Sequence, residues 1–430
     1  MLGAFVNSFR TPDLRRKLLF VLGMVVIFRA GSQLPAPGVN VANVKTCVSQ
    51  VHNDSLYGLI NLFSGGALLR LTVFALGIMP YITASIILQL LVVVIPRLEA
   101  LKKEGQAGQS KITQYTRYVT LALAILQATG IVALARAGQL LQCDLPLLYN
   151  PSIMTMLIMV ITMTAGTCVI MWLGELITDR GIGNGMSILI FTQVVATFPA
   201  TLWALKQQKG WAVFAMVIVI GLVIVATVIL MEQGQRRIPV QYARRMVGRK
   251  MYGGSSTYIP LKVNQAGVIP VIFASSLLYL PALLTQFDRN GNSPVTRWIA
   301  GHLVRGDHPY YMILYFALIV FFTYFYVSIT FNPEEVADNM KKYGGFIPGI
   351  RAGRPTEEYL SYVLSRITLP GATYLGLIAL IPLIALVLVG ANQNFPFGGT
   401  SLLIMVGVAL DTVKQIESQL QQRNYEGFLR

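Results

Sequence analysis

Long apolar stretches, most of them close to twenty residues, alternate along the chain with charged or Pro/Gly-rich breaks. A helix needs roughly 20 apolar residues, at about 1.5 Å each, to cross a hydrocarbon core about 30 Å thick. The pattern therefore predicts ten membrane-spanning helices in one membrane domain. They cover 18–34, 73–95, 118–136, 153–174, 186–203, 212–231, 267–285, 311–331, 367–390 and 399–415.

The first apolar run is expected to be a span and not a cleaved leader. It ends at Leu34 and continues into Pro35 and Pro37, whereas a leader would end in small residues at a cleavage site. Composition supports lipid as the main solvent, since 54% of the 430 residues are hydrophobic and 12% are charged. Soluble domains are about 45–50% apolar and about 25% charged.

Positive charge predicts the orientation of the chain. With a cytosolic N-terminus, the inner side collects 25 Lys and Arg residues, the outer side collects 8, and Arg29 lies within the first span. Since Lys/Arg asymmetry sets topology, both termini are predicted to be cytosolic. The net charge of +16 is thus mostly a matter of membrane orientation.

One nonapeptide pattern occurs twice, 190 residues apart. Gly77–Ser85 and Gly267–Ser275 both read G-x-x-P-x-I-x-A-S. Each lies in the second of five predicted spans, so the halves 1–205 and 206–430 must have opposite orientations, as in the inverted repeats of transport proteins. Proline and glycine inside a span predict a flexible hinge or a pore-lining role in each half; an ordinary kink is the alternative.

A short apolar segment, Leu59–Leu68, precedes the second span and is too short to cross the membrane. With Gly65 and Gly66 as a bend, it is expected to be a re-entrant half-helix that enters from the outer face. An amphipathic segment on the outer membrane surface is the alternative.

Two loops on the predicted cytosolic side, 232–266 and 332–366, are long and basic. Their Gly and Pro residues predict tight hairpin-like excursions. Together they are expected to form a docking surface for an acidic or nucleic-acid partner, although positive-inside charge alone could explain either loop.

Chemical motifs are scarce. Ionisable residues are few within the apolar spans, and Glu175, Glu232 and Asp411 lie near cytosolic ends, where they are expected to reach water. The chain lacks H-E-x-x-H, G-x-S-x-G and P-loop patterns. Its three cysteines show no metal or redox spacing and imply no disulfide framework. Flexible repeated helices without a charged relay indicate a passive conduit with an apolar constriction.

Two other classes of protein have signatures that can be compared with the chain. A secondary transporter would need a polar site at the membrane midplane, for which only scattered candidates such as Gln89 and Asn264 exist. An intramembrane enzyme would need a nucleophile and a base, and no such pair is evident.

Several longer motifs resemble the SecY family over essentially the full chain. They are Phe63–Ala67 with Ala75–Ile82, Trp172–Glu175 with Arg180–Gly185, Gly234–Pro239, Phe331–Asn339 and Phe397–Ser401. The resemblance implies an all-α membrane protein with two inverted five-helix halves around a central hourglass pore. It also implies a plug helix and a lateral gate between spans two and three and spans seven and eight, to which Gln89 and Asn264 would belong.

The resemblance further implies a non-enzymatic channel, without cofactor or metal, in the cytoplasmic membrane. SecA or the ribosome would drive unfolded preproteins through it, and SecE and SecG would be its partner subunits. The implied site residues fall into three sets: a pore ring (Ile78, Ile82, Met186, Ile190, Ile272, Ile404), a plug (Leu59, Ile60, Leu62, Phe63, Ser64, Gly65, Gly66, within about 57–70), and motor or ribosome contacts (Arg236, Arg237, Arg244, Arg245, Arg249, Lys250, Arg351). Met186 departs from the β-branched residue usual at its position.

Overall fold

The computed structural model describes most of the chain and divides it into two compact units. The described residues are 11–50, 67–68, 70–136, 145–150, 152–242, 245–247, 250–252, 256–275, 277–278, 294–303, 308–389 and 399–428. One unit comprises 1–217, 386–397 and 404–430, and the other comprises 218–385 and 398–403. Helical residues occur in each of the ten predicted spans.

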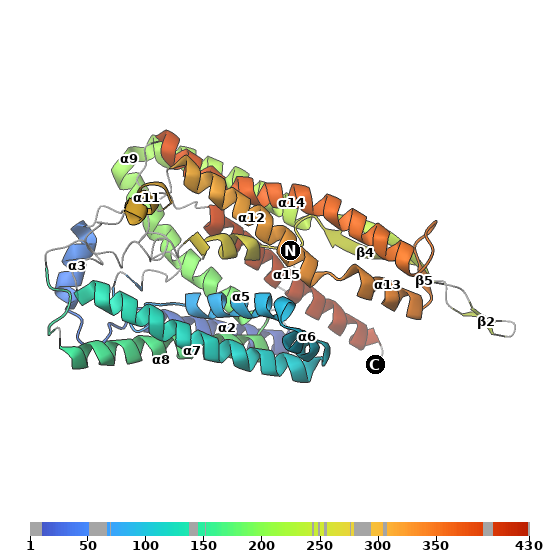
Figure 1. The fold of residues 1–430 in the computed structure, drawn as a ribbon, viewed down its shortest axis with the longest axis horizontal. Coiled ribbons are helices and arrows are strands. Elements are labelled where there is room, and N and C mark those ends of the chain that lie inside the picture. The colour runs from blue at the N-terminus through green and yellow to red at the C-terminus, as the bar shows by residue number, and fades with distance from the viewer. Residues whose placement is uncertain are drawn as a thin grey trace. The chain divides into compact units, whose positions relative to one another are not determined.

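The first unit contains a group of helices that pack against one another (Figure 1). They are α2 (Pro12–Gly31), α5 (Met79–Val94), α6 (Pro96–Lys103), α7 (Gln106–Arg136) and α8 (Ile153–Arg180). The unit also contains α3 (Val41–Gln50) and most of α15 (Gly399–Phe428). Small residues on α7, among them Ala124 and Ala128, are fully buried in its core. Such residues allow close helix contact, the usual means of packing in lipid.

Five helices among the described residues are long and apolar enough to cross a membrane, and the bent pair α5 and α6 raises this to as many as six. The bend of 100° falls at Pro96, where the predicted second span ends. Spans five and six lie within α9 (Gly185–Gln233), which consists of two helices that meet at a kink at Gly210, where the backbone is not helical. Gly210 has φ 81° and ψ −178°, a conformation that only glycine adopts readily.

The second unit carries α11 (Pro294–His302), α12 (Pro309–Thr330), α13 (Pro333–Lys342) and α14 (Arg354–Val389). The motif F-N-P-E-E explains the start of α13. Asn332 Oδ1 accepts from the Glu334 amide, and Pro333 occupies the first turn. Two glutamates at the N-terminal end and two lysines at the C-terminal end complement the helix dipole.

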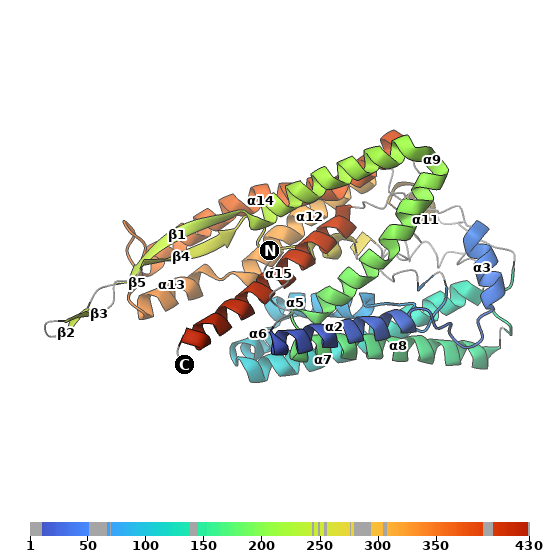
Figure 2. The ribbon, with the colours of Figure 1, turned by 180° about the vertical axis from the view of Figure 1, so that it is seen from behind.

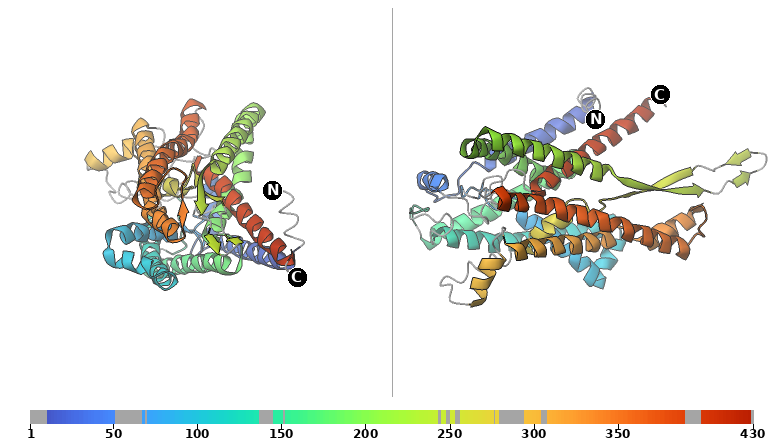
Figure 3. Two further views of the ribbon diagram at one scale, coloured as in Figure 1. Left: turned by 90° about the vertical axis from the view of Figure 1, so that its right-hand side faces the viewer. Right: turned by 90° about the horizontal axis from the view of Figure 1, so that it is seen from above.

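The hairpin predicted within 232–266 is confirmed. Strand β1 (Gln235–Tyr242) pairs antiparallel with β4 (Ser256–Lys262), and β2 (Arg245–Val247) pairs with β3 (Lys250–Tyr252) beyond them. Figure 2 shows the β1–β4 pair and, beyond it at the tip, the β2–β3 pair. Figure 3 shows that the hairpin extends past the ends of α13 and α14.

The prediction of a hairpin within 332–366 is wrong. That loop consists of α13, a two-residue strand β5 (Gly345–Phe346) and the first turns of α14. Strand β5 pairs with β1 in the sheet order β4-β1-β5, so both long loops contribute to one sheet. The sequence did not reveal this pairing because a two-residue strand has no period to detect.

Candidate functional site

The repeated nonapeptide forms the same backbone turn in each unit. Gly77 has φ 57° and Gly267 has φ 62°, and both values lie in the left-handed region that glycine favours. The amide of Ile82 donates to the Ile78 carbonyl over 3.2 Å, and the amide of Ile272 donates to the Val268 carbonyl over 3.3 Å. We call Gly77–Ile82 and Gly267–Ile272 the repeat turns.

The prediction of a hinge within each helix is wrong. Helix α5 begins at Met79, and the helix of the second repeat begins at Ile269, so Pro80 and Pro270 stand in the first turn of their helices. Proline fits there because the amide it lacks would have had no intrahelical partner. Residues 73–78 are turns. The motif therefore starts a helix where the sequence predicted a flexible interior.

A glycine on a neighbouring helix holds each repeat turn in place. Gly166 of α8 leaves room for the carbonyl of Val73, and Gly371 of α14 leaves room for the carbonyl of Val263. A Cβ at either glycine would collide with that carbonyl oxygen. Val73 and Val263 each lie four residues before the glycine of their repeat turn. The sequence repeat is therefore also a repeat of packing.

The first repeat turn has a further anchor in Phe74. Its ring stacks on Phe28 of α2 with a centroid distance of 5.9 Å, and it occupies the space that a side chain at Gly31 would fill. A fixed turn of this kind sets where the following helix begins. It also sets the direction in which Ile78 and Ile82 leave the backbone.

The predicted ring residues differ in exposure. Ile78, Ile190, Ile272 and Ile404 are buried, whereas Ile82 and Met186 are half-buried. Ile78 and Ile82 belong to the first repeat turn, and Ile272 belongs to the second. Ile404 lies in the first turns of α15.

Met186 and Ile190 follow a tight turn between α8 and α9. Asn184 caps α9 by accepting from the Met186 amide over 3.0 Å, and Thr178 Oγ1 accepts from the Gly185 amide over 2.9 Å. Gly185 has no room for a Cβ because the Gly174 carbonyl lies against it. The Met186 side chain in turn fills the space beside Gly174. The motif from Trp172 to Gly185 thus encodes close packing between the two helices.

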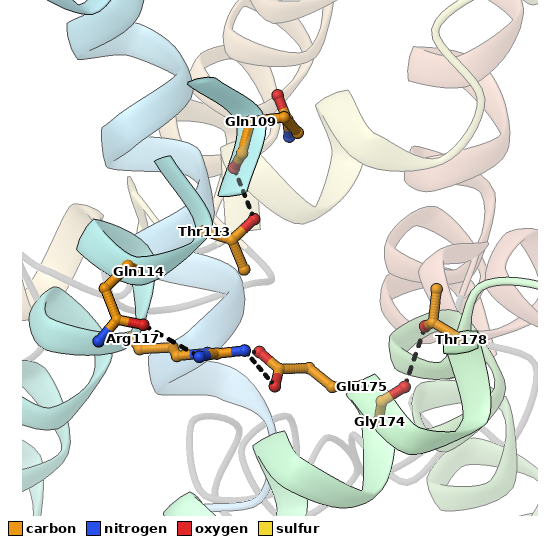
Figure 4. Close-up of polar contacts among 7 residues, drawn as sticks. All are labelled: Gln109, Thr113, Gln114, Arg117, Gly174, Glu175 and Thr178. Atoms are coloured by element: carbon orange, nitrogen blue, oxygen red, sulfur yellow. Dashed lines mark hydrogen bonds and ion pairs between the residues drawn. The ribbon is translucent and has the colours of Figure 1, made fainter. Parts of the chain in front are cut away.

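An ion pair between α7 and α8 lies next to this turn, and the sequence reading missed it. Arg117 Nε and Nη2 donate to the two carboxylate oxygens of Glu175 over 2.9 and 2.8 Å, and Arg117 Nη1 donates to Gln114 (Figure 4). Such bidentate pairs fix orientation as well as charge. The Glu175 side chain remains 22% exposed in this pair, so the expectation that it reaches water holds, and the structure adds its basic partner. The predicted spans place both residues at the cytosolic side of the membrane, and this shared side was the one feature of the sequence that could have indicated the pair.

The two polar residues singled out within spans have different surroundings. Gln89 of α5 is exposed. Asn264 is buried, and its amide nitrogen donates to Glu232 and to the carbonyl of Gly267. Through these two hydrogen bonds, Asn264 links the second repeat turn to Glu232 near the end of α9. Glu232, which was also expected to reach water, is half-buried and bonded to Asn264.

The long loops form a single packed structure, which we call the loop body (β1, β4, β5, α13 and the start of α14). Its core is apolar and draws on all of these elements: Ile238, Val240, Leu261, Met340, Ile347, Leu360 and Val363. Strand β1 alternates, with Ile238 and Val240 buried and its arginines exposed. The loop body therefore presents basic side chains from an ordered support.

The predicted contact residues that the structure describes lie on this body and on the β2–β3 pair beyond it. Arg236 and Arg237 are exposed on β1, and the Arg237 guanidinium lies 4.8 Å from the centre of the Tyr258 ring. Arg245 and Lys250 stand on the β2–β3 pair. Arg244 and Arg249 lie outside the described residues, as do the predicted plug residues 59–66.

Arg351 stands on a tight bend of the loop body. Gly349 and Gly353 flank it with φ 84° and 107°, and the buried Thr356 hydroxyl donates to the Arg351 carbonyl over 2.8 Å. The side chain is exposed. Net charge is concentrated in the other loop: 232–266 has seven Lys/Arg and one Glu, whereas 332–366 has five Lys/Arg and five Asp/Glu.

Solved structures and curated relatives resemble this chain. A structure described as a protein conducting channel matches with a TM-score of 0.64 at 19% identity, covering 94% of this chain and 91% of that one. Sec61 in the canine ribosome-channel complex matches with a TM-score of 0.61 at 18% identity over the same shares. These likenesses show the fold, and the all-α membrane architecture expected from the sequence is confirmed.

Sequence comparison identifies the family. Protein translocase subunit SecY of Streptomyces galbus is 69% identical over 438 residues, and that of Mycobacterium tuberculosis H37Rv is 62% identical over 441, each with full coverage of both chains. The SecY family model matches residues 72–413. The chain, a multi-pass membrane protein, therefore belongs to the SecY family.

Proposed function

We propose that this protein-conducting channel subunit, which is not an enzyme, passes unfolded preproteins across the cytoplasmic membrane and releases signal sequences and membrane segments sideways into lipid. The observation that carries the proposal is the pair of repeat turns, because each presents an isoleucine, Ile82 or Ile272, at the same place of an identical local structure. Both termini are proposed to be cytosolic, following the charge asymmetry.

The proposed constriction consists of the six predicted ring residues. Apolar side chains suit a sliding chain of varied sequence because they make no specific hydrogen bonds that would stall it, and they close an empty pore by packing or dewetting. Residues 59–66 are proposed to be the plug that closes the outer funnel at rest.

A double substitution tests the ring. Replacing Ile82 and Ile272 together with serine should increase ion leakage through the resting channel, measured as conductance in planar bilayers. The matched control is the pair Ile161→Ser and Ile313→Ser, one from each unit, since both side chains are strongly exposed at apolar helix surfaces. Conductance equal to that of the control would refute the assigned ring.

The driving force is proposed to come from SecA or from a translating ribosome bound at the loop body, with SecE and SecG as further subunits. Clustered arginines suit either partner because guanidinium groups pair with carboxylates and with ribosomal RNA phosphates. The likeness to Sec61 in a ribosome-channel complex supports the ribosome as one partner.

Reversing the charge of Arg351 tests this docking. Arg351→Glu should abolish SecA-driven translocation of a precursor into inverted membrane vesicles, while the amount of folded protein stays unchanged. Arg354→Glu is the matched control, since Arg354 is also exposed and lies nearby but pairs with Glu358. A solute transporter would show no secretion defect with either variant.

A further inference from the structure

We infer that Cys47 and Cys143 form a disulfide bond that ties the first outer loop to the loop between α7 and α8. The inference rests on the proposed orientation, which puts both loops outside the membrane. In the structure Cys47 is disulfide-bonded and Cys168 is a free thiol. The expectation that the cysteines form no disulfide is therefore wrong, because cysteine spacing along the chain does not show which loops meet. The chain contains three cysteines, so Cys143, which lies outside the described residues, is the remaining candidate within the chain.

Contacts among described residues bring the two loops together. The side-chain amide of Asn43 donates to the Pro146 carbonyl over 2.9 Å, and the backbone amide of Asn40 donates to the Leu147 carbonyl over 2.9 Å. Val39 and Leu148 form an antiparallel bridge. Helix α3 and the residues just after Cys143 are therefore held side by side.

The chain geometry allows the bond. Asn43 and Cys47 stand one helical turn apart on the same face of α3, and Asn43 touches Pro146. Cys143 precedes Pro146 by three residues, which span at most about 10 Å. A disulfide requires Cα atoms about 4.4–6.8 Å apart. The length of chain between Pro146 and position 143 is therefore compatible with a bond to Cys47.

Cys47 also stands in a setting that suits a structural disulfide. Its side chain is fully buried in a cluster with Val44, Leu147 and Leu148, where a reductant has little access. Cys168 lies instead in the apolar span α8, away from any aqueous oxidant. Disulfides form and persist outside the cytosol, so the proposed topology separates the paired cysteines from the free one.

Bond formation is a two-electron oxidation. The two thiols lose two protons and two electrons and form one S–S bond, and the disulfide of a thiol–disulfide exchange protein outside the membrane takes up both electrons and becomes a dithiol. The product fixes the end of α3 immediately before residues 51–66, which contain the proposed plug. The root of the plug would then be covalently held to its own half of the channel.

Thiol counting on the full chain in membranes tests the inference. The membranes are denatured in SDS, with or without prior reduction, and free thiols are labelled with a polyethylene-glycol maleimide. Each labelled thiol slows the protein on a gel by one step, and these shifts are counted. We expect one shift without reduction and three after it, and mass spectrometry should find a reductant-sensitive peptide pair containing Cys47 and Cys143. Three shifts without reduction, or a reductant-sensitive dimer, would overturn the inference.

Variants give the matched controls. C168S should show no shift without reduction and two after it, whereas C47S and C143S should each show two shifts without reduction, because each frees the other member of the pair. In C47S, labelling of Cys143 by a membrane-impermeant maleimide in intact cells tests the orientation separately. Labelling supports the proposed topology even if wild-type thiols prove free; protection of Cys143 would overturn the topology and this inference with it.

Discussion

At the scale of single residues, two glycines hold the repeat turns through contacts that no side chain could allow. Gly166 and Gly371 belong to different units, and each faces the carbonyl of the valine that precedes the turn, Val73 or Val263. Glycine weakens a helix by about 0.5–1 kcal/mol relative to alanine. At these positions the close approach of backbone is the compensating gain.

Alanine at either glycine should therefore destabilise the protein. Gly166→Ala or Gly371→Ala forces the turn away from its helix, at a cost of about 1–3 kcal/mol that is typical of overpacking. The measurement is the apparent melting temperature in detergent. Gly130→Ala in α7 is the control, since nothing lies within 4 Å of an added Cβ there. A control as damaging as the variants would show that close packing is not the cause.

At the scale of elements, the repeat turn is a device that starts a helix inside the apolar part of the chain. A left-handed glycine ends the irregular segment, and a proline fills the first helical turn. Irregular backbone at membrane depth is tolerated only where protein or a cavity surrounds it. Each turn is accordingly packed against a helix of its own unit, through Gly166 in one and Gly371 in the other.

Substitution at Gly267 separates backbone strain from crowding. Its φ is 62°, and nothing lies within 4 Å of an added Cβ, so Gly267→Ala should cost about 1–2 kcal/mol through the left-handed backbone alone. Asparagine tolerates that region better, so Gly267→Asn should lose less stability in the same thermal unfolding assay. Equal losses for the two variants would contradict a role for φ.

At the scale of the whole molecule, the loop body makes two distant loops depend on one another. Leu360 of α14 is fully buried beside residues of β1 and α13, and β5 completes the sheet. The basic hairpin and the Arg351 bend thus share one core. Binding of a partner to either loop would therefore depend on both loops being folded.

Removing part of this core should loosen both loops together. Leu360→Ala should cost about 2–5 kcal/mol of local stability and should raise amide hydrogen exchange in 235–242 as well as in 345–351. Tyr343→Ala is the control, since Tyr343 is 77% exposed and should leave exchange unchanged. Faster exchange confined to one loop would mean that the loops fold separately.

The sequence by itself determined the features that depend on local composition. Membrane insertion follows from hydropathy summed along each segment, and helical residues occur in all ten predicted ranges for that reason. The repeat was readable because identical residues impose identical turns. The hairpin in 232–266 was readable from its glycines and prolines.

The tertiary structure alone decided which distant groups meet. Examples are Arg117 with Glu175, β5 with β1, and the carbonyls of Val73 and Val263 with their glycines. It also turned the expected proline hinges into helix starts, because neighbouring backbone holds the preceding segment out of the helix. Such pairings depend on the path of the chain through space, and hydropathy, charge and turn residues record only what each segment favours locally.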